Sequence, residues 1–141
     1  MTDFVIEKME ESDREAIREI CCDTGNTGKD IRPLIDDENL FADIWTLYYT
    51  DYEPQSAFVA RVGGKTVGYL TGCLDTRHFN RVFSRKLIPL IIFKAARGHY
   101  RLGSKTLIYL KNILSQLLKG KVYPPLHLYP AHLHININIA S

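Results

Sequence analysis

Residues 56–75, SAFVARVGGKTVGYLTGCLD, constrain the fold more than any other stretch of this sequence. On both sides of the Gly63-Gly64 pair the side chains alternate in kind with a period of two, and β-branched and aromatic residues are frequent. Such alternation is typical of strands, and a Gly-Gly pair suits a two-residue turn. We therefore predict a β-hairpin; the alternative is two buried segments of another kind.

Charge divides the chain at the end of this hairpin. All 16 acidic residues lie at or before Asp75, so residues 1–76, with 7 Lys and Arg, carry a formal charge of −9 and residues 77–141 carry +11. A half without carboxylates indicates an anionic partner such as a phosphorylated cofactor, nucleic acid or a lipid surface. The alternative is that the two halves neutralise each other within one folded domain. The length of 141 residues suits a single domain.

The cysteines and the apolar runs indicate a cytoplasmic protein. Cys21, Cys22 and Cys73 are an odd number and two are adjacent, which implies no disulfide framework. We expect one core and one peripheral thiol in the adjacent pair. The start of the chain has no signal-peptide pattern. The longest apolar run, residues 87–93, is far shorter than the ~20 residues of a membrane span, so no membrane partner is predicted.

Helical and extended patterns flank the hairpin. A short strand is predicted at residues 4–9, a helix from Ser12 to Gly25, and a second helix that begins at Asp36 or Asp37. The aromatic residues of this second segment could line a substrate pocket or simply pack on the sheet; they are Phe41, Trp45, Tyr48, Tyr49 and Tyr52.

After the hairpin, residues 77–120 have a helical and basic pattern. One buried face is expected from apolar residues at helical spacing: Leu87, Ile88, Ile91, Ile92 and Ala95. Residues 132–139, HLHININI, alternate strictly and predict a final strand. His132 and His134 share one side of that strand, a spacing seen in zinc sites. His127 is the only nearby third ligand, and no metal site is predicted.

Three segments resemble the GNAT superfamily of N-acetyltransferases: FVIEKMEESD at the start, FVARVGGKTVGYLTGCLD as the second and third strands, and YPAHLHININ as the fourth. The resemblance covers essentially the whole chain. It implies an α/β (α+β) fold with a mixed, mostly antiparallel sheet and flanking helices. Residues 1–141 would form one domain, with a basic helical insert at residues 77–121, here called the insert.

The resemblance also implies a chemistry. Acetyl-CoA would pair with the fourth strand through the backbone of Ile135, Asn136, Ile137 and Asn138, and a backbone N–H there would polarise the thioester carbonyl. An amine acceptor would lie near Trp45, Tyr48 and Tyr52. Tyr49 and Asp75 are the candidate catalytic residues. Judged from the residues alone, Asp75 suits either a general base or a helix cap.

The sequence departs from the family pattern after the fourth strand. The family continues with a Gln/Arg-x-x-Gly-x-Gly/Ala loop that holds the CoA pyrophosphate at a helix N-terminus, and this chain reaches Ser141 without it. We therefore expect a fold that is incomplete at the C-terminus, impaired activity, and a homo-oligomer formed through an open strand edge. The alternative function is a non-catalytic interaction module, which binds protein or, through the basic insert, nucleic acid.

Overall fold

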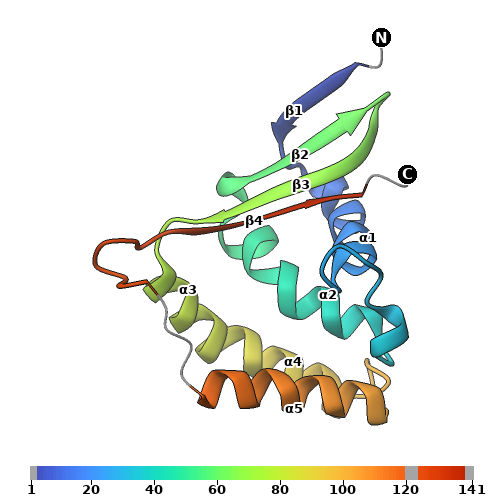
Figure 1. The fold of residues 1–141 in the computed structure, drawn as a ribbon, viewed down its shortest axis with the longest axis vertical. Helices are drawn as coiled ribbons and strands as arrows, with labels where there is room; N and C mark the ends of the chain where they lie inside the picture. The colour runs from blue at the N-terminus through green and yellow to red at the C-terminus, as the bar shows by residue number, and fades with distance from the viewer. Residues whose placement is uncertain (1–2, 120–123, 139–141) are drawn as a thin grey trace.

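The hairpin expected at residues 56–75 forms the two middle strands of a four-stranded sheet (Figure 1). The computed structural model describes residues 3–119 and 124–138. The strands are β1 (Phe4–Lys8), β2 (Ala57–Val62), β3 (Lys65–Cys73) and β4 (His132–Ile137), in that spatial order, and every described pairing is antiparallel. Gly63 and Gly64 have φ angles of 56° and 79°, which only glycine adopts readily. The hairpin prediction is confirmed.

Two helices lie on one side of the sheet (Figure 1): α1 (Arg14–Thr24) and α2 (Glu38–Leu47). The start of α2 is the one expected from the sequence, because the Asp37 carboxylate accepts the Leu40 N–H at 3.1 Å and so caps the helix. A π-helical turn, Tyr48–Tyr52, follows α2 directly. The α+β class with flanking helices is confirmed.

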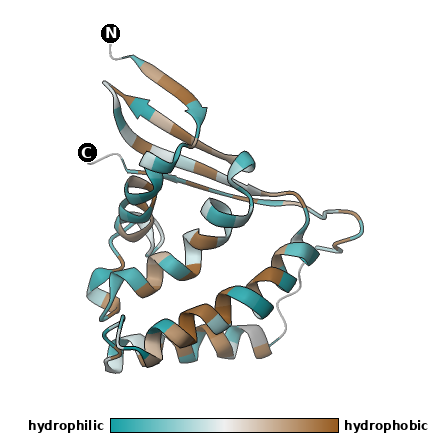
Figure 2. Cartoon of the chain, turned by 180° about the vertical axis from the view of Figure 1, so that it is seen from behind, coloured by the Kyte–Doolittle hydropathy of each residue, from teal (hydrophilic) through white to brown (hydrophobic). Residues whose placement is uncertain are grey.

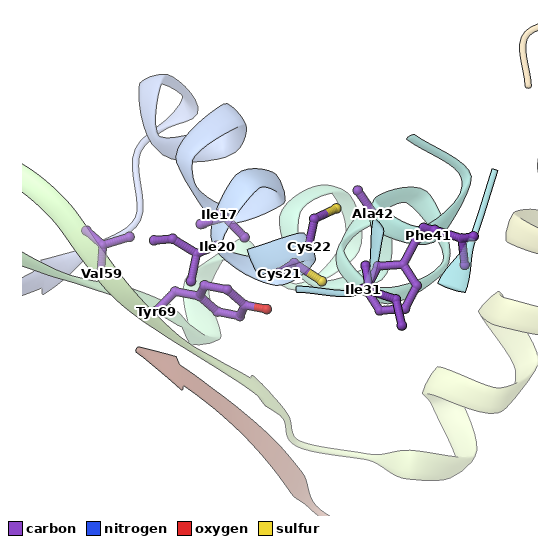
Figure 3. Close-up of a cluster of buried hydrophobic side chains, with 10 residues drawn as sticks. Ile17, Ile20, Cys21, Cys22, Ile31, Phe41, Ala42, Val59 and Tyr69 are labelled. Carbon is purple, nitrogen blue, oxygen red and sulfur yellow. The ribbon is translucent and has the colours of Figure 1, made fainter. Parts of the chain in front are cut away.

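The core lies between α1, α2 and the covered side of β2 and β3 (Figure 3). Its side chains include Ile17, Ile20, Ile31, Phe41, Val59 and Tyr69. Cys21 and Cys22 are both buried, so the expectation of one peripheral thiol is wrong. Cys22 faces α2, where its thiol lies 3.6 Å from the Glu38 carbonyl. Burial raises the pKa of Cys21 to about 11 and that of Cys22 to about 12, which keeps both thiols protonated.

The other face of the sheet is apolar and exposed. Within residues 3–119 and 124–138, no helix covers it, and large side chains of β1 and β4 stand between 56% and 64% exposed: Phe4, Ile6, Leu133, Ile135 and Ile137. The fourth strand is next to the hairpin as expected, but it lies at the edge of the described sheet. Ile139, the last residue of the predicted strand, lies outside the described residues.

The insert between β3 and β4 is helical, as predicted. It contains α3 (Thr76–Val82), a π-helical turn (Phe83–Leu87), α4 (Ile88–Ala96) and α5 (Ser104–Leu118); its expected end at residue 121 is outside the described part. Apolar residues recur along these helices (Figure 2). The chain leaves and returns at one point, because Thr76 donates from both its N–H and its hydroxyl to the Pro130 carbonyl, each at 2.7 Å.

The apolar face expected on α4 is mostly not buried. Leu87 is fully buried, but Ile88 and Ile92 are 41% and 62% exposed. Polar contacts hold this part of the insert to the sheet with α1 and α2, here called the body. Lys94 and Tyr100 both donate to the buried carboxylate of Asp43 on α2. Among the helices that the structure describes, none has the length and apolarity needed to cross a bilayer.

Candidate functional site

The backbone of β4 presents a row of hydrogen-bonding groups at the edge of the sheet. Asn138 donates its N–H to Val67 on β3 at 2.9 Å, so these residues form a hydrogen-bonded pair. Such pairs alternate along an antiparallel ladder, and the register Gly68↔Ile137 to Cys73↔His132 carries the alternation through the strand. The N–H and C=O groups of Leu133, Ile135 and Ile137 therefore point away from β3.

This register divides the four residues expected to hold acetyl-CoA into two kinds. Ile135 and Ile137 offer backbone groups to the edge. Asn136 and Asn138 use their backbones toward β3, and their side chains reach the helix-covered side. There the Asn136 amide donates to the Tyr69 hydroxyl at 2.6 Å, and the Asn138 amide donates to Asp23 at 2.8 Å.

A pocket of about 160 Å³ opens on the same side of β4. We call it the aromatic pocket. It lies between α1, α2, β3, β4 and α5, and its walls contain five rings and no charged side chain; the lining residues are Cys21, Gly25, Phe41, Trp45, Tyr69, Thr71, Tyr109, His134 and Asn136. It therefore combines an apolar surface with a few neutral polar groups, as small-molecule sites commonly do.

His132 stands in a hydrogen-bonded chain whose direction can be worked out. The Thr76 hydroxyl gives its only proton to the Pro130 carbonyl, so it must accept from His132 Nδ1, which lies 2.8 Å away. The neutral ring then has a bare Nε2, which accepts the Tyr49 hydroxyl at 3.1 Å. Burial lowers the pKa of His132, with a smaller contribution from His134, and this favours the neutral form.

His134 differs from His132 because its ring nitrogens have no hydrogen-bond partner among the described residues. Its ring meets Trp45 edge-on at 6.5 Å between centroids and Tyr49 at 5.7 Å, and it lines the aromatic pocket. Desolvation lowers the pKa of His134, so the imidazole is neutral near pH 7. A neutral imidazole with a bare nitrogen beside a pocket can accept a proton from a bound molecule.

Of the aromatic residues expected to face an acceptor, only Trp45 lines the aromatic pocket. Tyr48 is buried and donates to the Glu53 carboxylate at 2.8 Å. Tyr52 stacks on Tyr48 with 6.2 Å between ring centroids, and the Lys86 ammonium lies over its outer face. Tyr48 belongs to a second packed cluster, which contains Val82 of α3 and Leu87 of the insert. Tyr52 lies outside this cluster and is partly exposed.

The two candidate catalytic residues lie in different surroundings. Tyr49 is 3% exposed, is hydrogen-bonded to His132 and contacts the His134 ring. Burial raises its pKa far above the usual tyrosine value, so it stays protonated. Asp75 is exposed and caps α3, since its carboxylate accepts the Arg77 N–H at 2.9 Å. The structure thus brings Tyr49, but not Asp75, into contact with the two histidines.

Sequence reasoning did not assign His134, Tyr69 or Tyr109 to the site. The signal for His134 was present in the HLHIN alternation, but we weighed it only as a metal ligand. Across residues 3–119 and 124–138, no three His, Cys, Asp or Glu side chains are grouped to hold a metal. Tyr109 reaches the pocket from the insert, a contact 64 residues from Trp45 that no local pattern signals.

A larger hollow, of about 340 Å³, lies against α1 near the hairpin turn. Its buried carboxylate already has partners: Asp13 accepts from Arg61 at 2.7 Å and from the Thr66 hydroxyl at 3.2 Å. Its size alone does not make it a site for chemistry. The aromatic pocket is smaller, but it adjoins the strand edge and a histidine with a bare nitrogen.

Comparison with known proteins gives a match to a solved structure. No protein-family model matches the chain. The crystal structure of a protein named SsHAT, a name that indicates an acetyltransferase, superposes with a TM-score of 0.73 at 29% sequence identity. The match covers 97% of this chain and 67% of SsHAT. The chain therefore has an acetyltransferase-like fold.

Proposed function

We propose that this chain is an N-acetyltransferase of the GNAT superfamily, which transfers an acetyl group from acetyl-CoA to a primary amine. The fold shared with SsHAT supports acetyl transfer as the general class of activity. Fold likeness alone does not determine a function, which depends on the residues of the site.

The observation that carries the proposal is the edge of β4 beside the aromatic pocket. The pantetheine arm of acetyl-CoA has amide groups that can pair with outward backbone groups, as an added strand does. Ile135 and Ile137 are the residues whose outward groups suit this pairing. One of their N–H groups would lie against the thioester oxygen and stabilise the negative charge that develops there during attack.

His134 is suited to take the proton that an ammonium must lose before it can attack. The N–H bond of the ammonium breaks and an N–H bond to the imidazole forms. The amine nitrogen then bonds to the thioester carbon, and the C–S bond breaks as the carbonyl re-forms. The thiolate takes the proton held by the His134 imidazolium, and the new amide loses its remaining extra proton to water.

The other candidate residues support this chemistry in different ways. Trp45 forms one wall of the acceptor pocket. Tyr49 acts as a positioning residue, since its buried ring packs on His134 and its hydroxyl fixes His132. Tyr48 and Tyr52 stabilise the π-helical turn that places Tyr49. We assign Asp75 to the capping of α3, because its carboxylate is engaged with the helix N-terminus.

The test is acetyl-CoA binding by calorimetry, followed by release of free CoA with a panel of primary amines. We expect saturable binding, and we expect His134→Gln to lower turnover about 10²- to 10⁴-fold, the usual contribution of a general base, while acetyl-CoA binding is retained. His127→Gln is the matched control, because His127 is an exposed loop residue away from the pocket. Absence of acetyl-CoA binding, or equal loss in both variants, would contradict the proposal.

A further inference from the structure

The walls of the aromatic pocket are unusual for an amine site because they contain no carboxylate. None of the nine lining residues is Asp, Glu, Lys or Arg. Asp43, the acidic residue between Phe41 and Trp45 on α2, is not a lining residue and already binds Arg18, Lys94 and Tyr100. An anionic or zwitterionic group would find no charged partner in these walls.

The rings are arranged at angles to one another rather than in a stack. The Phe41 ring lies 6.2 Å from Trp45 with a 45° tilt and 5.8 Å from Tyr109 with a 53° tilt. The Trp45 indole N–H donates to the Tyr109 hydroxyl at 3.0 Å, which ties α2 to α5. His134 meets Trp45 at a 75° angle. Because these pocket rings are not stacked on one another, their faces are not covered by each other, and the face of an aromatic ring attracts a cation.

The opening of the pocket is also aromatic. Trp45 is 42% exposed, whereas Phe41 and Tyr69 are only 4% and 5% exposed and form the deep wall. A volume of about 160 Å³ accommodates a short chain of heavy atoms but not a nucleotide or a folded peptide. The ligand class that fits best is therefore an unbranched alkyl chain that ends in a cationic group.

We propose that the aromatic pocket is a cation–π cage for an alkylammonium group, with Tyr109 of the insert as one of its walls. On the further premise of the proposed acetyl transfer, the acceptor is an aliphatic primary amine that enters the cage as its cation. The ammonium N–H bond then breaks as the bond to the bare nitrogen of His134 forms. The insert therefore takes part in acceptor selection through α5.

The binding test needs no catalysis, because Trp45 is the only tryptophan in the chain and reports on the pocket by its fluorescence. Purified protein is titrated with n-butylammonium chloride at pH 7.5, and in parallel with 1-butanol at matched ionic strength. An alkylammonium is charged at this pH. We expect the cation to bind about 2- to 30-fold more tightly than the alcohol, the range that cation–π contacts supply. Equal affinity, or no response to the cation, overturns the cage.

Two variants of one residue separate the ring from its hydroxyl. Tyr109→Phe keeps the ring and loses the bond to Trp45, so the preference for the cation should persist. Tyr109→Leu removes the π-face, and the preference should fall toward unity while the circular dichroism spectrum is unchanged. A preference that survives Tyr109→Leu undiminished would contradict the assigned wall.

The outcomes also distinguish this inference from the proposed function. If the protein binds the cation selectively but no amine releases CoA, the cage is supported and the acetyl transfer is contradicted. If amines release CoA but the alcohol binds as tightly as the cation, the acetyl transfer is supported and the cage is contradicted.

Discussion

Replacement of Asp43 by asparagine is the perturbation with the largest effect on stability that the structure allows us to work out. The carboxylate is 2% exposed and binds three donors: Arg18 on α1, and Lys94 and Tyr100 of the insert. The asparagine side chain would keep the volume but lose the negative charge. Two cationic groups would then remain at the junction of the body and the insert without their counter-ion.

The expected cost follows from the exposure of the partners. Removal of one member of a fully buried ion pair costs about 3–5 kcal/mol. The Arg18 side chain is 15% exposed and that of Lys94 is 33% exposed, so water offsets part of the loss. We therefore expect Asp43→Asn to lower the free energy of unfolding by about 2–4 kcal/mol.

Urea denaturation, followed by Trp45 fluorescence and far-ultraviolet circular dichroism, measures this difference. Asp30→Asn is the control, because Asp30 is 49% exposed and its pair with Arg32 is a surface contact. Its cost should stay below about 1 kcal/mol. If Asp43→Asn costs no more than the control, the assignment of Asp43 as the link between the body and the insert is wrong.

The stability difference between wild type and Asp43→Asn should also depend on pH. Burial alone would raise the pKa of Asp43, but the hydrogen bonds from Lys94, Tyr100 and Arg18 outweigh it and leave the pKa below its usual value. The stabilisation is thus fully present above the unfolded pKa of about 3.9 and is lost as pH falls through the lower folded value. The difference between wild type and Asp43→Asn should narrow in urea titrations below about pH 4.

Three further predictions follow from other contacts. Tyr48→Phe removes the hydrogen bond to buried Glu53 and should cost about 1–3 kcal/mol in the same urea assay; a cost near zero would show that this bond is dispensable. The pKa values of His132 and His134 are lowered in the folded protein, so the unfolded protein binds protons at higher pH, and the free energy of unfolding should fall as pH drops below about 6.5. A variant with glutamine at both positions should lose this pH dependence. We also expect self-association through the β4 edge, which sedimentation equilibrium would detect as an oligomer. Either Ile135→Lys or excess acetyl-CoA should convert this oligomer to monomer. An oligomer that acetyl-CoA does not affect would indicate a different interface.

The sequence predicted the elements whose signals are local. The hairpin was readable because Gly63 and Gly64 supply the turn between two alternating arms, and α2 was readable because Asp37 caps it. The register of β4 was not readable in the same way. Which of its backbones face the edge depends on the bond between Asn138 and Val67, a contact 71 residues apart.

The site was predicted only in part, for a related reason. Trp45, which we expected near an acceptor, lines the aromatic pocket, but its neighbours Tyr109 and His134 come from distant segments. The aromatic run after residue 44 also continues through a π-helical turn, which rotates Tyr48 and Tyr52 away from the pocket and toward the insert. A regular helical projection of the sequence does not contain that rotation. Likewise, the apolar spacing in α4 predicted a buried face, but the helix contacts α2 through the ion pair between Lys94 and Asp43.

The bonds from Thr76 to the Pro130 carbonyl mean that the long excursion between the third and fourth strands begins and ends at one fixed point. A segment tethered in this way can be exchanged for another without any change in strand pairing. Proteins that share these four strands can therefore differ in the helices between Thr76 and Pro130. A different insert would place a different side chain, or none, where Tyr109 lies beside Trp45. Under the proposed acetyl transfer, the choice of acceptor would then vary with these helices while the β4 edge stays the same.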